Sequence, residues 1–209
     1  MAYHNTRAWR YELYKETKRL APSYPVSPSE KINYNPGYTF EKKYDSTEIT
    51  ITDEDTLIAG KRLKDAGYNP MMLNFANDRH PGGGVESGAG SQEESLFRRT
   101  NLHLTLLQPM YPIKDHQGIY TPAATVFRDS EDNHCTVFAT PWEGAFATVP
   151  GIYHPNITSD GRLDARDASR LAKKIRIILQ MGAQKGHDAL VLGALGCGAW
   201  GNPPAHVAS

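Results

Sequence analysis

Three consecutive glycines constrain the fold of this chain more than any other feature. They are Gly82, Gly83 and Gly84, and they follow an apolar stretch at residues 70–75. Glycine has no Cβ, so its backbone can adopt positive φ and lie close to a ligand. Successive free N–H groups in such a loop form a concave site for an anion such as phosphate. The sequence therefore predicts a buried strand that leads into a phosphate-binding turn.

An acidic pair opens the element that follows this turn. Gln92, Glu93 and Glu94 begin a segment that we predict to be a helix over residues 92–107. One interpretation is structural, because Ser91 as N-cap and Glu94 three residues later fit a capping box. A cap needs no glycines upstream, however. A carboxylic acid beside a phosphate-binding loop indicates chemistry on a phosphorylated sugar.

The triplet, the seven-residue spacer and the Gln-Glu-Glu sequence together resemble the signature of poly(ADP-ribose) glycohydrolases. The flanks look like the microbial branch of that family, with Asn-Phe-Ala-Asn at residues 74–77 and Ser-Leu-Phe-Arg-Arg at residues 95–99. The resemblance covers about residues 48–204. It implies a macrodomain fold that binds ADP-ribose.

The resemblance also implies roles for individual residues. Glu94 matches the family's catalytic glutamate, a general acid and base, and Glu93 would hold ribose hydroxyls. Neighbouring helical side chains point about 100° apart, so the pair cannot flank one bond as the two carboxylates of ordinary glycosidases do. Asn77 is a candidate for hydrogen bonding to the distal ribose, and a turn-forming asparagine is the equal alternative. The expected substrate-binding residues here are Asn77, Gly82, Gly83, Gly84 and Gln92.

A second glycine-rich loop follows a predicted strand at residues 188–192. Two loops that each follow a strand could grip a diphosphate from both sides, and the resemblance implies that this one is the diphosphate-binding loop. Its expected substrate-binding residues are Gly193, Gly196, Cys197, Gly198, Ala199 and Trp200. Trp200 stands where the family usually has a phenylalanine packed on the distal ribose; a core aromatic is the alternative. We interpret Cys197 as a small packing residue rather than a reactive thiol.

Hydrophobic periodicity and turn residues divide the remainder into helices and strands. The predicted helices span residues 7–20, 53–66, 92–107 and 164–181, with Thr52 or Asp53 capping the second, Ile58 on its inward side, and Gly67 and Gly182 as stops. The predicted strands span residues 48–52, 70–75, 120–127, 135–140 and 188–192, the last of them buried. Residues 141–160 are expected to be irregular. Strands that alternate with helices indicate an α/β fold, here a macrodomain-like mixed sheet with helices on both faces.

We expect a single structural unit. Residues 1–47 would form an N-terminal helix and an extended wrapping segment, and residues 48–209 the macrodomain-like catalytic domain. The family's long C-terminal helix is expected to be missing, because few residues follow Asn202. Either the chain is truncated there, or the N-terminal segment covers the sheet in place of that helix.

Charge and composition exclude several classes of protein. Lysine plus arginine equals aspartate plus glutamate, at 23 each, so no net basic field attracts nucleic acid. The eight histidines and two cysteines show no metal-ligand spacing, and we expect no metal and no cofactor. The first residues lack a secretory signal and no stretch is long enough to span a bilayer. This predicts an intracellular protein, cytoplasmic or nuclear, that is monomeric and does not contact a membrane.

The predicted function is hydrolysis of ribose–ribose O-glycosidic bonds in poly(ADP-ribose) on modified proteins, with release of ADP-ribose. Two alternatives stay open: a macrodomain that binds ADP-ribose without cleaving it, and a mono-ADP-ribosyl hydrolase. The intact Glu93-Glu94 pair favours a hydrolase, because a binding module has no use for the acid.

Overall fold

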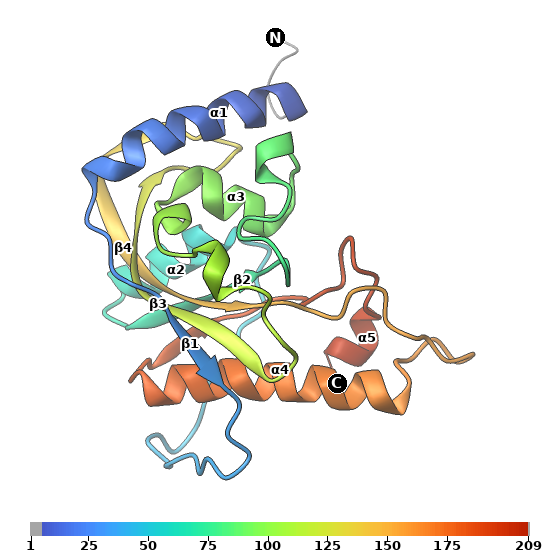
Figure 1. Cartoon of the computed structure of the whole chain (residues 1–209). Helices are drawn as coiled ribbons and strands as arrows, with labels where there is room; N and C mark the ends of the chain where they lie inside the picture. The colour runs from blue at the N-terminus through green and yellow to red at the C-terminus, as the bar shows by residue number, and fades with distance from the viewer. Residues whose placement is uncertain (1–5, 209) are drawn as a thin grey trace.

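The computed structural model describes residues 6–208, and its elements form three layers (Figure 1). Within these residues a five-stranded sheet lies in the middle, with α1 (Arg7–Leu20), α2 (Thr56–Asp65) and α3 (Gln92–Arg99) on one face. Helix α4 (Ala165–Gln184) covers the other face. This arrangement confirms the predicted α/β fold with a mixed sheet and helices on both faces.

The sheet combines antiparallel and parallel pairs. Its strands are β1 (Glu30–Asn33), β2 (Pro70–Phe75), β3 (Gln117–Arg128), β4 (Val137–Val149) and β5 (Ala189–Val191), in the spatial order β1-β3-β4-β2-β5. Strand β3 pairs antiparallel with β1 and β4, whereas β2 pairs parallel with β4 and β5. The carboxyl ends of β4, β2 and β5 therefore meet at one edge, which is where open α/β sheets bind their ligands.

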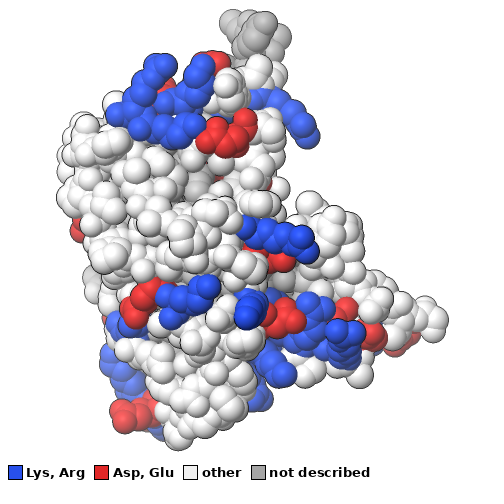
Figure 2. All heavy atoms as spheres, viewed as in Figure 1, with Lys and Arg blue, Asp and Glu red and all other residues white. Residues whose placement is uncertain are grey.

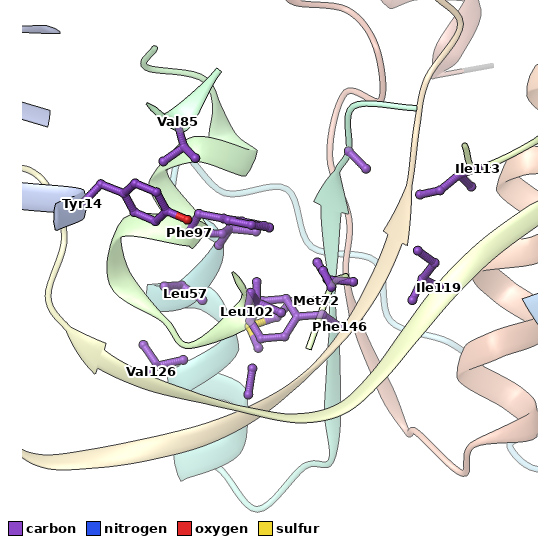
Figure 3. Packing of buried hydrophobic residues seen from close by; sticks show 14 of the residues in the cluster. Tyr14, Leu57, Met72, Val85, Phe97, Leu102, Ile113, Ile119, Val126 and Phe146 are labelled. Atoms are coloured by element: carbon purple, nitrogen blue, oxygen red, sulfur yellow. The ribbon is translucent and has the colours of Figure 1, made fainter. Parts of the chain in front are cut away.

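Two buried hydrophobic clusters hold the layers together. The first includes Tyr14, Leu57 and Phe97 and packs α1, α2 and α3 against the sheet (Figure 3). The second includes Ile177 and Met181 and packs α4 on the opposite face. Phe97 is 1% exposed, so the short helix that begins with the acidic pair is fixed in the core. Large apolar side chains buried in this way each contribute about 1.5–3 kcal/mol.

Two helices begin after a residue whose side chain caps the first turn. Helix α1 has the predicted bounds, with Thr6 as its N-cap. Helix α2 is capped by Asp55, whose side chain accepts from the N–H groups of Leu57 and Ile58. The predicted cap at Thr52 or Asp53 was therefore wrong, and the side chain of Ile58, expected to face inward, is 43% exposed.

Glycine marks two helix ends, but only one of them as predicted. Gly67 follows α2 with a φ of +92°, as expected for a stop. Gly182, in contrast, is buried inside α4, which continues to Gln184, and Gly186 supplies the left-handed residue with a φ of +74°.

Helix α3 is half the predicted length. It ends at Arg99 because Thr100 leaves the helical conformation and pairs with Val126 of β3. The Thr100 hydroxyl donates to the Leu96 carbonyl and satisfies one of the last carbonyls of the helix. The predicted continuation to residue 107 contains the 3₁₀ turn Leu102–Leu104 instead, and a second 3₁₀ turn, Gln108–Met110, follows it.

Three predictions about the strands also need correction. Residues 48–52 form no strand, and Ile49 and Ile51 are 85% and 95% exposed, because no strand of the described chain lies beside them. Residues 141–149, predicted to be irregular, continue β4, where they pair with both β2 and β3. Strand β5 lies at the sheet edge and is half-buried rather than buried.

The terminal segments add to the same layers. Strand β1, which was not predicted, pairs with β3, and α1 packs near α3. After the second glycine loop the chain forms the four-residue helix α5 (Pro204–Val207). Residues 1–5 of the predicted N-terminal segment and Ser209 lie outside the described residues. Within residues 6–208, no helix is both long and apolar enough to cross a membrane.

Candidate active site

The first glycine loop packs directly on the acidic pair. Gly82 and Gly83 have φ values of +74° and +52°. A Cβ on Gly83 would lie 2.7 Å from Glu94 Oε1 and 3.3 Å from Glu93 Oε2. A Cβ on Gly82 would lie 2.5 Å from the ring of Phe97. Glycine is therefore required here both by backbone conformation and by space.

The N–H groups of this triplet are not free, contrary to prediction. Gly82 donates to Glu93 Oε1 at 3.3 Å and Gly84 donates to Glu94 Oε1 at 2.8 Å. Gly83 donates to the carbonyl of His80. The triplet thus orients the two carboxyl groups instead of presenting a row of empty donors to an anion.

Gln92 fixes the start of α3 to the end of β2. Its Oε1 accepts from the N–H of Phe75 at 2.9 Å, and its Nε2 donates to the carbonyl of Leu73 at 2.7 Å. Nε2 also lies 3.2 Å from Thr56 Oγ1 at the start of α2. The structure therefore gives Gln92 a positioning role, and its contact with substrate stays a prediction.

Glu93 is turned into the protein. It is 2% exposed, and its carboxyl accepts from the Asn77 N–H at 2.7 Å and from Asn74 Nδ2 at 3.3 Å, besides Gly82. Burial raises the pKa of Glu93 to about 8, the neighbouring charge of Glu94 adds to this, and the hydrogen bonds oppose it. Glu93 ties the end of β2 to both the loop and α3.

Glu94 has a different environment. It is 7% exposed, and its Oε1 accepts from Gly84, whereas its Oε2 is buried and has no hydrogen-bond partner in the described structure. Buried carboxyl oxygens are almost always hydrogen-bonded. An unsatisfied oxygen in a loop-lined site indicates a place for a ligand hydroxyl or a reacting oxygen.

Asn77 forms a turn. Its Oδ1 accepts from the N–H groups of Arg79 and His80 at 2.8 and 3.0 Å, a local pattern typical of asparagine in turns. These bonds agree with the alternative interpretation of Asn77 as a turn-forming asparagine. A bond from Asn77 to ribose stays a prediction.

The second glycine loop reaches the first through shared contacts. A Cβ on Gly193 would lie 2.5 Å from the ring of Phe75, the last residue of β2. A Cβ on Gly151, just after β4, would lie 2.7 Å from the Cα of Gly196. The loops that follow three parallel strands therefore converge at one edge of the sheet.

This second loop keeps the open donors that the first lacks. Gly193, Gly198 and Ala199 are exposed. Within the described chain, no acceptor is found for the N–H groups of Gly196, Gly198 and Ala199. Such unengaged backbone donors, next to a glycine with a φ of +77° at Gly196, suit an anion.

Trp200 and Cys197 complete this loop. Trp200 is half-buried, lines a cavity, and its ring meets Tyr153 edge-on with centroids 5.6 Å apart. It is therefore not a core aromatic. Burial raises the pKa of the Cys197 thiol, which agrees with a packing role rather than a reactive thiolate.

Two positioning residues were missed by sequence reasoning. Asn74, fully buried within β2, donates to Glu93 and to Thr148 Oγ1 of β4. Asn202, 1% exposed, donates from Nδ2 to the carbonyls of Ile152 and Gly196 at 2.7 and 2.9 Å. An asparagine inside an apolar strand and another closing a glycine loop were the available signals. Among residues 6–208, no group of three or more His, Cys, Asp or Glu side chains could hold a metal ion.

Comparison with known structures agrees with this geometry. The chain is similar to poly(ADP-ribose) glycohydrolase from Thermomonospora curvata, with 29% identity and a TM-score of 0.82 over 95% of this chain and 84% of that one. The same enzyme bound to the inhibitor ADP-HPD gives 29% identity and a TM-score of 0.79 over 95% and 83% of the two chains. The Deinococcus radiodurans enzyme in complex with ADP-ribose gives 25% identity and a TM-score of 0.64 over 97% and 76%.

No curated protein matches the chain significantly. Residues 3–129, more than half of the chain, match the family model described as microbial-type PARG, catalytic domain. PARG denotes poly(ADP-ribose) glycohydrolase, and the matched residues include β2, the glycine triplet and the acidic pair. The chain therefore belongs to the family of microbial-type poly(ADP-ribose) glycohydrolase catalytic domains.

Proposed function

We propose that this protein hydrolyses the ribose–ribose O-glycosidic bonds of poly(ADP-ribose), with Glu94 as general acid and base. The observation that carries the assignment is the buried, unpartnered Oε2 of Glu94. Its companion Oε1 is held by the Gly84 N–H, so the carboxyl is oriented while one oxygen remains available. Glu93 has no comparable freedom, because both of its oxygens accept bonds from the protein.

The mechanism follows from one available carboxyl group. Glu94 donates its proton to the leaving ribose oxygen as the bond to the anomeric carbon breaks, and an oxocarbenium-like state forms. The resulting carboxylate then removes a proton from the attacking water. In this proposal Glu93 positions the ribose, through lone pairs that its carboxyl oxygens keep beyond the bonds described.

The diphosphate of the terminal ADP-ribose unit would bind the second glycine loop. The unengaged N–H groups of Gly196, Gly198 and Ala199 support this assignment. In the proposal Trp200 packs on the distal ribose and Asn77 borders it. Gly82, Gly83 and Gly84 carry no side chains of their own, so their backbone packs closely on the carboxyl groups and keeps them oriented toward the substrate. Negative charge held near the anomeric carbon would stabilise the developing positive charge.

The biological substrate in this proposal is poly(ADP-ribose) on modified proteins, and the enzyme acts as a monomer without binding nucleic acid or membranes. The equal numbers of acidic and basic residues support the exclusion of nucleic acid. Cys135 and Cys197 are both free thiols, which supports an intracellular, reducing setting.

The test is release of ADP-ribose from poly(ADP-ribose) by the wild type and by Glu94→Gln. Loss of the acid should lower the rate by at least about 100-fold, while binding of free ADP-ribose stays within a few-fold. Glu86→Gln is the matched control. This exposed glutamate lies just after the glycine triplet and pairs with Lys18 of α1, and its replacement should retain full activity.

The same assay separates the alternatives. A wild type that binds the polymer but releases nothing would be a binding module. One that removes single ADP-ribose groups from protein while leaving chains intact would be a mono-ADP-ribosyl hydrolase. An active Glu94→Gln variant would refute the role of Glu94.

A further inference from the structure

A cavity of about 580 Å³ adjoins the proposed active site. Its walls include Asp78 and Arg79, directly after Asn77, and Trp200 at the end of the second glycine loop. The glycine triplet and Glu94 do not line it. Asn77 and Trp200 are the residues proposed to border the distal ribose, so the cavity begins where that ribose ends. In the polymer, the group beyond the distal ribose is the unit that leaves on hydrolysis.

Cationic side chains outnumber acidic ones around this cavity. The cationic residues are Arg79, Lys114, Arg170 and Lys174, and the acidic ones are Asp78 and Asp115. Four positive minus two negative groups leave a formal charge of +2 on the lining. Asp167, outside the lining, also pairs with Arg170 at 2.7 Å. Figure 2 shows basic and acidic side chains side by side along the hollowed part of this face.

Among these groups, Lys174 gives the strongest indication of an anion-binding site. Its side chain is 2% exposed, and Asp115 Oδ1 lies 3.3 Å from its Nζ. The same carboxylate is already held by Arg170, at 2.6 Å from Nε to Oδ2. An ammonium group has three donors, and among the described residues Asp115 is the one acceptor found for the buried Lys174 ammonium. An anion in the cavity would supply further acceptors for this ammonium.

Two aromatic side chains also line this cavity. Tyr153 is 65% exposed and lines the cavity together with Trp200. Exposed aromatic side chains provide stacking surfaces for nucleobases, as in single-stranded nucleic acid complexes. A cavity of this volume is within the range of about 300–1,000 Å³ seen for small-ligand sites.

We propose that this cavity binds the leaving unit of poly(ADP-ribose), with its cations on the diphosphate and its aromatic rings against the adenine. This inference rests on the proposed hydrolase function and extends it to the group on the far side of the scissile bond. Such a subsite would let the enzyme favour polymer over a single ADP-ribose group attached to a neutral acceptor.

The test compares two substrates that share the terminal ADP-ribose unit. One is poly(ADP-ribose), and the other is an ADP-ribose glycoside with a neutral nitrophenyl leaving group. The variant is Arg79→Gln/Lys114→Gln, which removes two exposed cations of the lining. The control is Lys15→Gln/Arg19→Gln, which removes the same charge from α1, a helix that contributes nothing to the lining.

The proposal predicts a selective loss. For the cavity variant, kcat/KM on the polymer should fall about tenfold at low salt, and its salt dependence should weaken, because fewer cations meet phosphate. Its kcat/KM on the nitrophenyl glycoside and the values for the control should stay within about twofold. Equal losses on both substrates would assign the cavity to the terminal unit itself, and an unchanged polymer rate would leave it without a role in binding; either result overturns the proposal.

A binding measurement keeps this test separate from the proposed function. If the wild type hydrolysed neither substrate, the hydrolase function would fail, yet the subsite would still be measurable. A fragment of two ADP-ribose units should then bind several-fold more tightly than free ADP-ribose, and the cavity variant should abolish the difference. Equal affinities in the wild type would overturn the subsite independently of catalysis.

Discussion

The two glycine-rich loops differ in what their backbone groups do. In the first, Gly82, Gly83 and Gly84 all donate to acceptors within the protein, and two of these bonds go to the acidic pair, Glu93 and Glu94. In the second, the N–H groups of Gly196 and Gly198 have no acceptor in the described chain. Similar composition therefore serves two purposes. The first loop orients carboxyl groups, and the second leaves backbone donors unengaged.

Replacing a glycine should expose this difference most strongly in the first loop. Gly83→Ala would place a Cβ 2.7 Å from Glu94 Oε1 at a residue with a φ of +52°. We expect kcat/KM to fall about 100-fold, because the carboxyl must move, and the free energy of unfolding to fall by about 2 kcal/mol.

Gly198→Ala is the matched change in the second loop, where a Cβ would meet no atom within 4 Å. Its free energy of unfolding should stay within about 0.5 kcal/mol of the wild type. Urea unfolding and steady-state kinetics of both variants check the contrast. Equal effects of the two substitutions would contradict the division of roles between the loops.

Loosening the second loop should affect binding more than chemistry. Asn202→Ala removes the two side-chain bonds that join Gly196 to Ile152. We expect a stability loss of about 1–3 kcal/mol, since buried carbonyls lose their donors. KM should rise about tenfold, because the diphosphate donors are less well ordered, while kcat changes little. A fall in kcat at unchanged KM would place this loop at the reacting bond instead.

The last contrast concerns the pH dependence of stability at the first loop. Burial raises the pKa of Glu93 from 4.5 to about 8. The native state therefore holds this proton more tightly than the unfolded state, so the free energy of unfolding should fall as pH rises from about 5 to about 8. Glu93→Gln has no titrating group at this position and should flatten that part of the profile. A profile of equal slope in both proteins, measured by urea unfolding, would show that Glu93 does not titrate in this range.

The sequence predicted best those elements whose structure depends on residues close together in the chain. Residues 70–75 and the glycine triplet predicted β2 and the turn after it, and periodicity located α1 and α4 because their apolar residues recur along one face. The predicted acidic pair does begin α3. Motif spacing alone was enough to identify the family that the comparisons confirm.

Long-range pairing set the features that the sequence did not reveal. Residues 141–149 lack a simple alternation because much of this part of β4 is buried on both faces, with Phe146 in the first hydrophobic cluster and Ala147 in the second. Residues 48–52 alternate well, yet alternation supplies no partner strand. The N–H groups of the triplet are engaged because α3 folds back onto them, which only tertiary structure shows. The cavity unites residues from α4, the chain after β4 and the second loop, which lie far apart in sequence.

The most direct test of the account is a crystal structure of the protein with ADP-ribose bound. We expect Glu94 Oε2 to lie within about 3 Å of an oxygen of the distal ribose, and the diphosphate to accept hydrogen bonds from the N–H groups of Gly196 and Gly198. A complex in which the diphosphate lies away from the second loop, or in which the ribose is out of reach of Glu94, would contradict it.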